Sequence, residues 1–276
     1  MATLAHAAGS GSGVDRLAYY LRVLRVIAAV EFKIKYAGSL LGYVWSLAKP
    51  LSYFAVLWFV FGRVFDTGIA GFPAYLLIGI VLYMFFVDAG GLGLASIVNR
   101  GPLLRRLAFP PAIIPVSVVV TALMTFCVNA VAVAVFVAFT GSSPSLSWLL
   151  LPLLVLELFV FVLGVAFFLA AMFVRFKDIG PLWELTAQLL LFATPVMYPV
   201  TLFPHWAQVV AFLNPLVQVT QDVRAIVLDD GGPHRIAADV LGGAAGHALP
   251  VAIALATLAV GLAVFQRDAP RIAERV

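Results

Sequence analysis

The chain has 276 residues, of which 63% are apolar and 11% are charged, and its mean hydropathy is +1.09. About a quarter of the residues of a soluble domain are charged, so this composition excludes a soluble globular protein and indicates an integral membrane protein. The formal net charge of +4 comes from short clusters at the ends of apolar runs, a pattern that does not favour nucleic-acid binding.

Residues 1–14 are small and mostly polar, and they are expected to be a disordered N-terminus before a transmembrane domain over 15–276. No cleaved signal peptide is expected, because the start lacks a basic region followed by an apolar one. The single cysteine, Cys127, allows no disulfide within the chain.

The segment 15–36 contains no Gly or Pro and predicts a helix. On a helical wheel, one side holds the charged residues Asp15, Arg22, Arg25 and Lys33, and another holds the apolar residues Leu17, Leu21, Leu24 and Ala28. This pattern favours an amphipathic helix in the cytoplasmic membrane interface, although Glu31 and Lys35 interrupt its apolar side. A short solvated helix is the alternative.

Six apolar runs predict an all-α polytopic membrane protein with six transmembrane helices. They cover residues 47–65, 72–97, 113–139, 148–174, 182–198 and 249–265. Fourteen of the seventeen Lys and Arg residues fall in segments that an alternating topology places on one side; the exceptions are Arg63, Arg224 and Arg235. The positive-inside rule therefore predicts a multi-pass protein with both termini in the cytoplasm.

Two connecting segments stand out. Residues 99–111, NRGPLLRRLAFPP, predict either a compact amphipathic helix over 102–108, stopped by the two prolines, or a simple topology-setting charge cluster. Residues 192–218 are apolar but interrupted by four prolines. Because irregular backbone at membrane depth must be buried in protein or line a cavity, we expect broken or re-entrant helices on the outer side.

Three acids, Asp88, Glu157 and Glu184, lie at or near membrane depth, where an ionisable group is costly. Either a transport role or structural pairing inside the bundle would explain each of them. The sequence has no Gly-Lys dipeptide and no HExxH motif, and its four histidines are scattered, so we expect no nucleotide-cradling loop, no catalytic residues and no metal site.

Four separated segments resemble one family. They are KYAGSLLGYVWSLAKPL at 35–51, VNRGPLLRRLAFPPAIIP at 98–115, FVRFKDIG at 173–180 and TPVMYPVTLFPHWAQVVAFLNPL at 194–216. In this order and spacing they resemble the type-2 ABC exporter permeases that export O-antigen, teichoic acid and related glycans. The resemblance covers about residues 17–275.

This resemblance implies a homodimeric permease in the bacterial cytoplasmic membrane, paired with two copies of a cytosolic ABC ATPase subunit. The permease itself would need no cofactor, since ATP and Mg would be used by the partner subunit. A lipid-linked glycan would pass between the two copies, among membrane lipids. The Ala-, Val- and Arg-rich usage hints at a high-GC bacterium, which makes a cell-wall galactan a plausible cargo.

The resemblance also assigns roles by position. The ATPase-coupling residues would be Asn99, Arg100, Leu104, Arg105, Arg106, Phe176, Lys177 and Asp178. The glycan path would include Tyr43, Trp45, Tyr53, Trp58, Trp183 and Phe192, because ring faces can stack against sugars. The outer gate would be formed by Pro195, Tyr198, Pro199, Trp206, Asn214 and Pro215.

Two other readings remain open. One is a type-2 ABC exporter of drugs or lipids, which the glycan-type first motif and the lack of a large outer domain argue against. The other is an integral-membrane lipid-sugar transferase, which would need clustered acidic or basic residues at one membrane face.

Overall fold

The computed structural model describes residues 13–36, 42, 44–65, 69, 71–100, 110–139, 145–228 and 235–275. Every regular element within these ranges is a helix, which confirms the all-α prediction. Five helical segments are long and apolar enough to cross a membrane, as expected for a polytopic membrane protein. They are Val44–Val64, Phe72–Asn99, Ile113–Phe139, Leu146–Arg175 and Gly246–Asp268.

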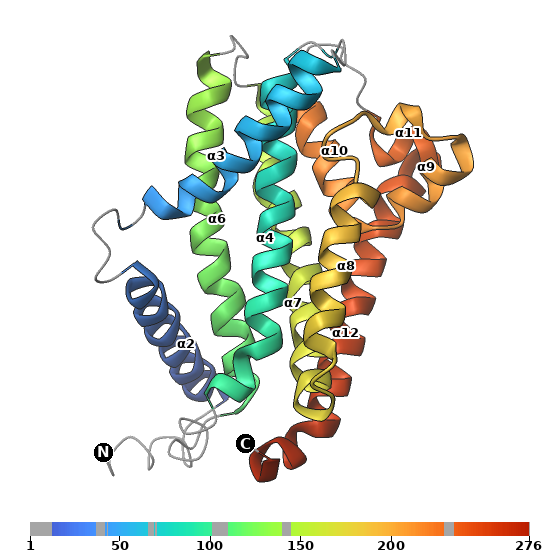
Figure 1. The fold of residues 1–276 in the computed structure, drawn as a ribbon. Coiled ribbons are helices and arrows are strands. Elements are labelled where there is room, and N and C mark those ends of the chain that lie inside the picture. Colours follow the sequence, from blue (N-terminus) through green and yellow to red (C-terminus); the bar gives the residue numbers. More distant parts are fainter. Residues whose placement is uncertain are drawn as a thin grey trace.

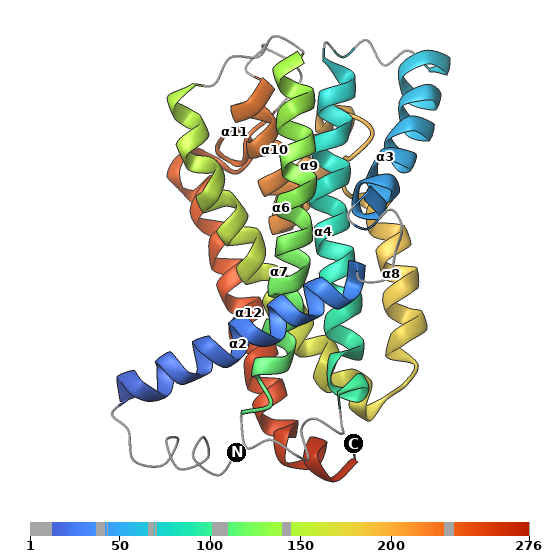
Figure 2. The same ribbon diagram turned by 90° about the vertical axis from the view of Figure 1, so that its left-hand side faces the viewer.

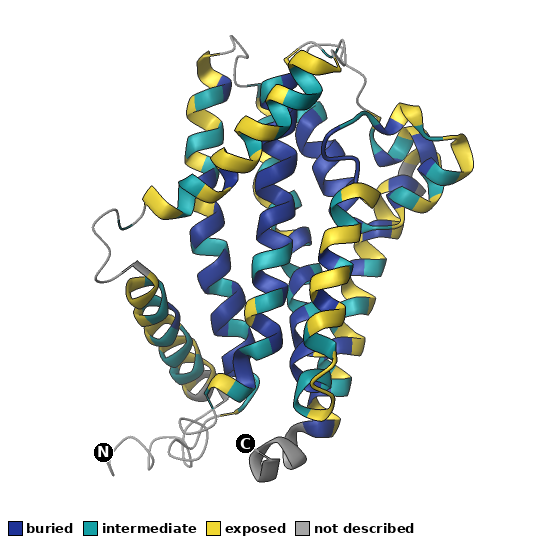
Figure 3. Ribbon diagram, in the orientation of Figure 1, coloured by how far each residue is buried: buried dark blue, intermediate teal, exposed yellow. Residues whose placement is uncertain are grey.

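Helix α4 (Phe72–Asn99) forms the centre of the bundle, with α6 (Ile113–Phe139) and α7 (Leu151–Arg175) packed against it (Figures 1 and 3). Most of α4 is buried, which agrees with its apolar residues lying on all sides rather than on one stripe. Small residues allow the close approach: a Cβ at Gly93 would lie 2.6 Å from the Cβ of Ala166 on α7.

The fifth predicted span, 182–198, corresponds to α8 (Ile179–Ala193), which is shorter than the other spans. The helix ends at Ala193 because Pro195 follows, and a residue that precedes proline is pushed out of the helical region. Thr194 accordingly has extended backbone, with φ −85° and ψ 126°. The prediction that this helix continues to residue 198 was therefore wrong by about five residues.

Helix α3 (Val44–Phe59) continues into one turn of π-helix, η1 (Val60–Val64), and leans away from the rest of the bundle (Figure 1). Most of its residues are exposed, including large apolar ones such as Val56 and Phe59 (Figure 3). A helix this apolar is unstable in water, so its outward face must be covered by lipid or by protein.

Helix α2 (Gly13–Tyr36) runs obliquely across α6 near one end of the bundle (Figure 2). Its packed side includes Tyr20, Val23, Leu24, Ile27 and Ala28. The helix was predicted, but its apolar side does not pack as one surface, because Leu17 and Leu21 are 60% and 55% exposed. These residues point away from the protein, as an interfacial helix requires; its placement at a membrane remains a prediction.

We call the end of the bundle that holds Arg100, the α7–α8 turn and the end of α12 the basal end, and the opposite end, with α9 and α11, the distal end (Figure 1). At the distal end the chain forms the 3-10 turn η3 (Val200–Leu202), α9 (His205–Phe212), α10 (Pro215–Leu228) and α11 (Ala237–Leu241). Proline precedes or begins the first three, and α10 is almost wholly buried. That these elements are re-entrant and lie on the outer side stays a prediction.

Helix α12 (Gly243–Arg275) returns from the distal to the basal end along α7 (Figure 2). Two glycines let the helices touch through their backbones. A Cβ at Gly261 would lie 2.1 Å from the carbonyl oxygen of Gly164, and a Cβ at Gly164 would lie 2.5 Å from the amide nitrogen of Leu258. Small residues at such crossings are typical of helix packing in membranes.

Candidate functional site

A cavity of about 860 Å³ opens between α3, α4, α6 and α8. We call it the charged cavity, because acidic and basic side chains from α2, α3, α4 and α8 line it. Its polar lining residues are Lys35, Ser46, Lys49, Asp88, Thr125, Asn129 and Glu184. Two of the three acids that the sequence places at membrane depth therefore share one cavity, whereas Glu157 lies elsewhere.

One ion pair crosses this cavity between two helices. The ammonium of Lys49 on α3 lies 2.7 Å from Oδ1 of Asp88 on α4, and both side chains are partly exposed. The Lys35 ammonium of α2 also donates a hydrogen bond to the Thr125 hydroxyl on α6 at 3.2 Å. Exposed pairs add little stability, so these contacts position the polar groups rather than hold the bundle together.

Trp183 connects α8 to α4 at the wall of the charged cavity. Its indole packs 5.5 Å from the ring of Phe86 and fits against Gly90, where a Cβ would lie 2.2 Å from the indole Cζ2. The Tyr83 hydroxyl donates a further hydrogen bond to the Ala187 carbonyl of α8. A large aromatic residue here thus requires glycine on the facing helix.

The structure brings only some of the predicted glycan-path residues together. Trp45, which is largely exposed, and Trp183, which is buried, both line the charged cavity. Tyr53 and Phe192 are exposed on α3 and α8 but do not line it, and Trp58 packs beside Phe54. Tyr43 lies outside the described residues.

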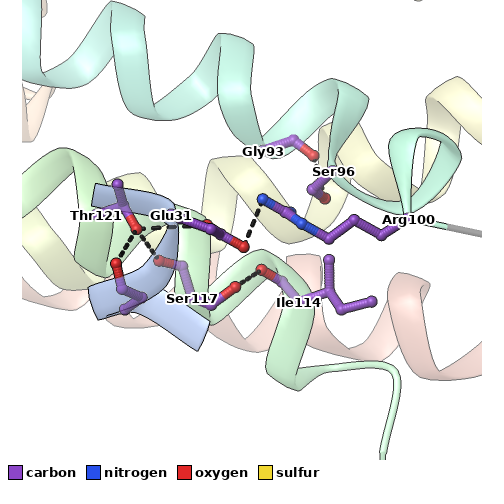
Figure 4. Close-up of polar contacts among 8 residues, drawn as sticks. Glu31, Gly93, Ser96, Arg100, Ile114, Ser117 and Thr121 are labelled. Carbon is purple, nitrogen blue, oxygen red and sulfur yellow. Dashed lines mark hydrogen bonds and ion pairs between the residues drawn. The ribbon is translucent and has the colours of Figure 1, made fainter. Parts of the chain in front are cut away.

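At the basal end, a second polar cluster joins three helices (Figure 4). The Arg100 guanidinium, at the C-terminal end of α4, lies 2.6 Å from Oε1 of Glu31 on α2. The Thr121 hydroxyl of α6 lies 3.4 Å from the other carboxylate oxygen of Glu31. Burial raises the pKa of the Glu31 carboxyl, and the charge of Arg100 opposes that rise.

For two residues, this cluster shows a contact that the sequence analysis did not predict. Arg100 was predicted as an ATPase contact, but the structure directs its guanidinium inward onto Glu31, with both side chains mostly buried. Glu31 was noted only as an interruption of the apolar side of the first helix, yet it lies on the packed side of α2. The cluster therefore ties α2 directly to the start of the basic link between α4 and α6.

Of the other predicted coupling residues, some lie within the described part of the chain and some lie outside it. Phe176, Lys177 and Asp178 form an exposed turn between α7 and α8 at the basal end, and Lys177 Nζ lies 4.5 Å above the ring of Phe173. Asn99 is exposed at the end of α4. The predicted residues Leu104, Arg105 and Arg106 lie outside the described residues, as does the helix expected over 102–108.

At the distal end, Arg224 on α10 is fully buried. Its Nε donates to the carbonyl of Tyr75 at 3.0 Å, while Nη1 and Nη2 donate to the carbonyls of Pro195 and Val196, each at 2.7 Å. The guanidinium also lies 3.5 Å from the centre of the Tyr75 ring. Gly79 makes room for it, because a Cβ there would lie 2.3 Å from Nη2.

Arg224 thus anchors the turn after α8 to both α4 and α10. Sequence reasoning counted it only as an outer-side charge. The available signal was an arginine followed by an apolar run, RAIVL, shortly after the proline-rich segment, because a buried charge must find polar partners.

Three of the six predicted gate residues make polar contacts in this region. Pro195 supplies one carbonyl to Arg224, and the Tyr198 carbonyl accepts a hydrogen bond from the Tyr75 hydroxyl at 3.0 Å. The Tyr198 hydroxyl donates back to the Phe192 carbonyl. Asn214 caps α10, since its Oδ1 accepts the amide of Leu216 at 3.0 Å.

Three predicted gate residues have no such polar role. Pro199 precedes η3, and Pro215 is buried at the start of α10, where a missing N–H is tolerated. Trp206 is 71% exposed on α9. Within the described residues, no group of three or more His, Cys, Asp or Glu side chains could hold a metal ion.

Comparison with known proteins identifies the family of this chain. Residues 22–228 match the ABC-2 type transporter family. The O-antigen export system permease protein RfbA of Myxococcus xanthus is 30% identical over 225 residues, which cover 81% of this chain and 85% of that protein. Two proteins of the same name from Klebsiella pneumoniae are 27% and 26% identical over 214 residues, 77% of this chain and 83% of each relative. The chain belongs to the ABC-2 type transporter family.

Proposed function

We propose that this chain is the membrane-spanning permease subunit of an ATP-driven exporter that moves a lipid-linked polysaccharide across the bacterial cytoplasmic membrane. The observation that carries this proposal is the similarity to O-antigen export permeases, which extends over about four fifths of both chains. The chain would act as a transport permease and not as an enzyme.

The charged cavity suits the membrane end of such a cargo. A glycan carried on a lipid diphosphate offers anionic phosphate oxygens and sugar rings. Lys35 and Lys49 supply ammonium groups that bind phosphate, and Trp45 presents an exposed ring against which a sugar could stack. We therefore place the first contact with the cargo at this cavity, between α3 and α8.

The energy source would be a separate subunit. The sequence contains no Gly-Lys dipeptide, so it cannot form the loop that cradles nucleotide phosphates. Two permease copies would pair with two copies of a cytosolic ABC ATPase, which would bind ATP and Mg. The exposed turn Phe176–Asp178 and the link that follows Arg100 would contact the ATPase, with Arg105 and Arg106 as its basic residues.

The decisive experiment reconstitutes the permease with its cognate ATPase in proteoliposomes and measures ATP hydrolysis as lipid-linked glycans are added. We expect hydrolysis to rise with the correct glycan and to vanish when the Walker lysine of the ATPase is replaced. Stimulation by small apolar drugs instead of glycans would favour a drug exporter. ATP hydrolysis by the purified permease alone would refute the assignment.

A further inference from the structure

A groove of about 750 Å³ separates α7, α10 and α12 on the distal side of the Gly164–Gly261 crossing. Its walls are mostly apolar, with Leu153 from α7 and Val251 and Leu255 from α12, and one part of it is polar. We call it the distal groove. It is separate from the charged cavity and shares no lining residue with it.

The polar part of the distal groove is rich in hydrogen-bond acceptors. It contains Glu157 of α7, Gln218 and Asp222 of α10, and His247 of α12. Gln218 and Asp222 are 1% and 5% exposed, and the Gln218 amide donates to Oδ2 of Asp222 at 2.6 Å. The Nδ1 atom of His247 lies 3.5 Å from the same oxygen.

Three acceptor atoms in this polar part have no hydrogen-bond partner within the described residues: Oε1 of Glu157, Oε1 of Gln218 and Oδ1 of Asp222. An unpaired buried acceptor is costly, so a native structure pairs such atoms with protein, water or a ligand. Arg224 does not serve them, although it lies on the same helix, because its guanidinium binds the carbonyls of Tyr75, Pro195 and Val196.

The depth of the polar part matches a lipid headgroup. His247 is the fifth residue of α12 (Gly243–Arg275), so it lies near the distal end of that helix. Leu255 lies eight residues further along the same helix, about two turns deeper. The groove thus runs from acceptors near the distal end of the helix to apolar walls nearer its centre.

We propose that the distal groove binds a membrane phospholipid with a primary ammonium headgroup, phosphatidylethanolamine. An ammonium carries three N–H donors and a positive charge, which complement three unpaired acceptors that include two carboxyl groups. The acyl chains lie along the leucine and valine walls. The lipid fills the wedge between α7 and α12 and stabilises α10, the helix that carries Arg224.

The test measures lipid binding to the purified, delipidated full-length chain by native mass spectrometry. Phosphatidylethanolamine, phosphatidylcholine and phosphatidylglycerol are compared with identical acyl chains. We expect about tenfold tighter binding of phosphatidylethanolamine than of phosphatidylcholine, because methylation keeps the charge but removes every N–H donor. Phosphatidylglycerol, which has no ammonium, should bind as weakly as phosphatidylcholine.

Two variants locate the site. Glu157→Gln should reduce the preference for phosphatidylethanolamine to within about twofold, and Leu255→Trp should displace the lipid by filling the groove. The matched control is Glu184→Gln, which changes an acid of the charged cavity and should leave the preference intact. If Glu157→Gln fails to fold, the wild-type comparison and Leu255→Trp still decide.

Equal binding of the three lipids would overturn the proposal, because the groove would then accept any acyl chain. A preference that survives both Glu157→Gln and Leu255→Trp would overturn it as well, since the lipid would bind elsewhere. Loss of a dimer in the Leu255→Trp variant would show that a second copy covers the groove, which also contradicts the proposal.

Discussion

Arg224 shows what one fully buried guanidinium can hold together. The planar guanidinium holds its N–H donors in fixed directions, and these donate to three carbonyl oxygens from two separate parts of the chain. The predicted gate segment therefore depends on a residue outside it. Its turn is held by Arg224 on one side and by the Tyr75–Tyr198 hydrogen bond on the other.

Arg224→Lys should destabilise the protein strongly. Lysine keeps the charge, but its compact ammonium cannot reach all three carbonyls, so buried acceptors lose their partners. We expect a loss of about 3 kcal/mol, seen as a fall in Tm on the order of 5 °C or more in detergent. The control is Arg235→Lys at an exposed position, and an equal effect of both changes would refute this role.

Glu31 should make stability depend on pH. Burial raises the pKa of this carboxyl in the folded protein above the ordinary value of 4.5, so the folded state holds the proton more firmly than the unfolded state. The contribution of Glu31 is then fully present at acidic pH and is lost as pH rises through the raised pKa. We expect the free energy of unfolding of the wild type to fall over this window relative to Glu31→Gln.

The measurement is Tm against pH for both proteins. The other titratable groups are common to both proteins, so the difference reports the titration of Glu31 together with its contacts to Arg100, Ser117 and Thr121. A difference that grows in favour of the wild type with rising pH would mean that Arg100 lowers the pKa of Glu31 below its ordinary value, and the prediction would be wrong.

The sequence analysis singled out Arg100 but missed the contacts of Glu31 and Arg224. Arg100 was found because its motif and its position after an apolar run are local features. Its partner Glu31 lies 69 positions earlier, on a helix whose crossing with the bundle is set by tertiary packing alone. Arg224 was missed for the same reason, since Tyr75 is 149 positions away.

At the scale of elements, α4 and α8 are fitted to each other through adjacent glycines. A Cβ at Gly90 would collide with the Trp183 indole, whereas a Cβ at Gly91 would lie 3.6 Å from its Nε1 in ordinary contact. Both positions lie within α4, but only Gly91 has room for a methyl group. They offer a matched pair of substitutions.

Gly90→Ala should cost about 1–3 kcal/mol, because the buried indole has to move, and it should disturb the wall of the charged cavity. Gly91→Ala should be neutral or slightly stabilising, since alanine favours helix over glycine. Thermal unfolding of the two variants checks this directly. Similar Tm values for both would show that Trp183 does not hold α8 in place.

The apolar runs predicted the elements well wherever a helix is long. Five of the spans differ from their predicted boundaries by no more than three residues, because hydropathy changes sharply at their ends. The run at 182–198 failed at its C-terminal end, since its residues beyond Ala193, TPVMY, are largely apolar but include Pro195. Hydropathy cannot separate a helix from a buried turn, whereas the proline could have indicated the boundary.

For the whole molecule, the exposed apolar side of α8 indicates where a second copy would pack. Leu182, Leu185, Leu189 and Phe192 recur every three or four residues and are all more than half exposed. This stripe forms one face of the helix. In the proposed homodimer, α8 of one copy would face the other copy across the glycan path.

Cysteine cross-linking tests this arrangement. In a Cys127→Ser background, Leu189→Cys should form a disulfide-linked dimer in membranes under mild oxidation. Leu255→Cys, at a position on α12 that is also more than half exposed, should not, because that helix lies on the other side of the bundle from α8 (Figure 2). A dimer band from Leu255→Cys alone would place the subunit contact on the opposite face.

Arg224 also bears on biogenesis. Every carbonyl that receives its guanidinium belongs to a residue synthesised earlier, since Tyr75, Pro195 and Val196 all precede it in the chain. As the nascent chain leaves the ribosome and enters the membrane, the partners of this charge are already present. The arginine can then dock as soon as it emerges, rather than waiting unpaired beside the lipid tails.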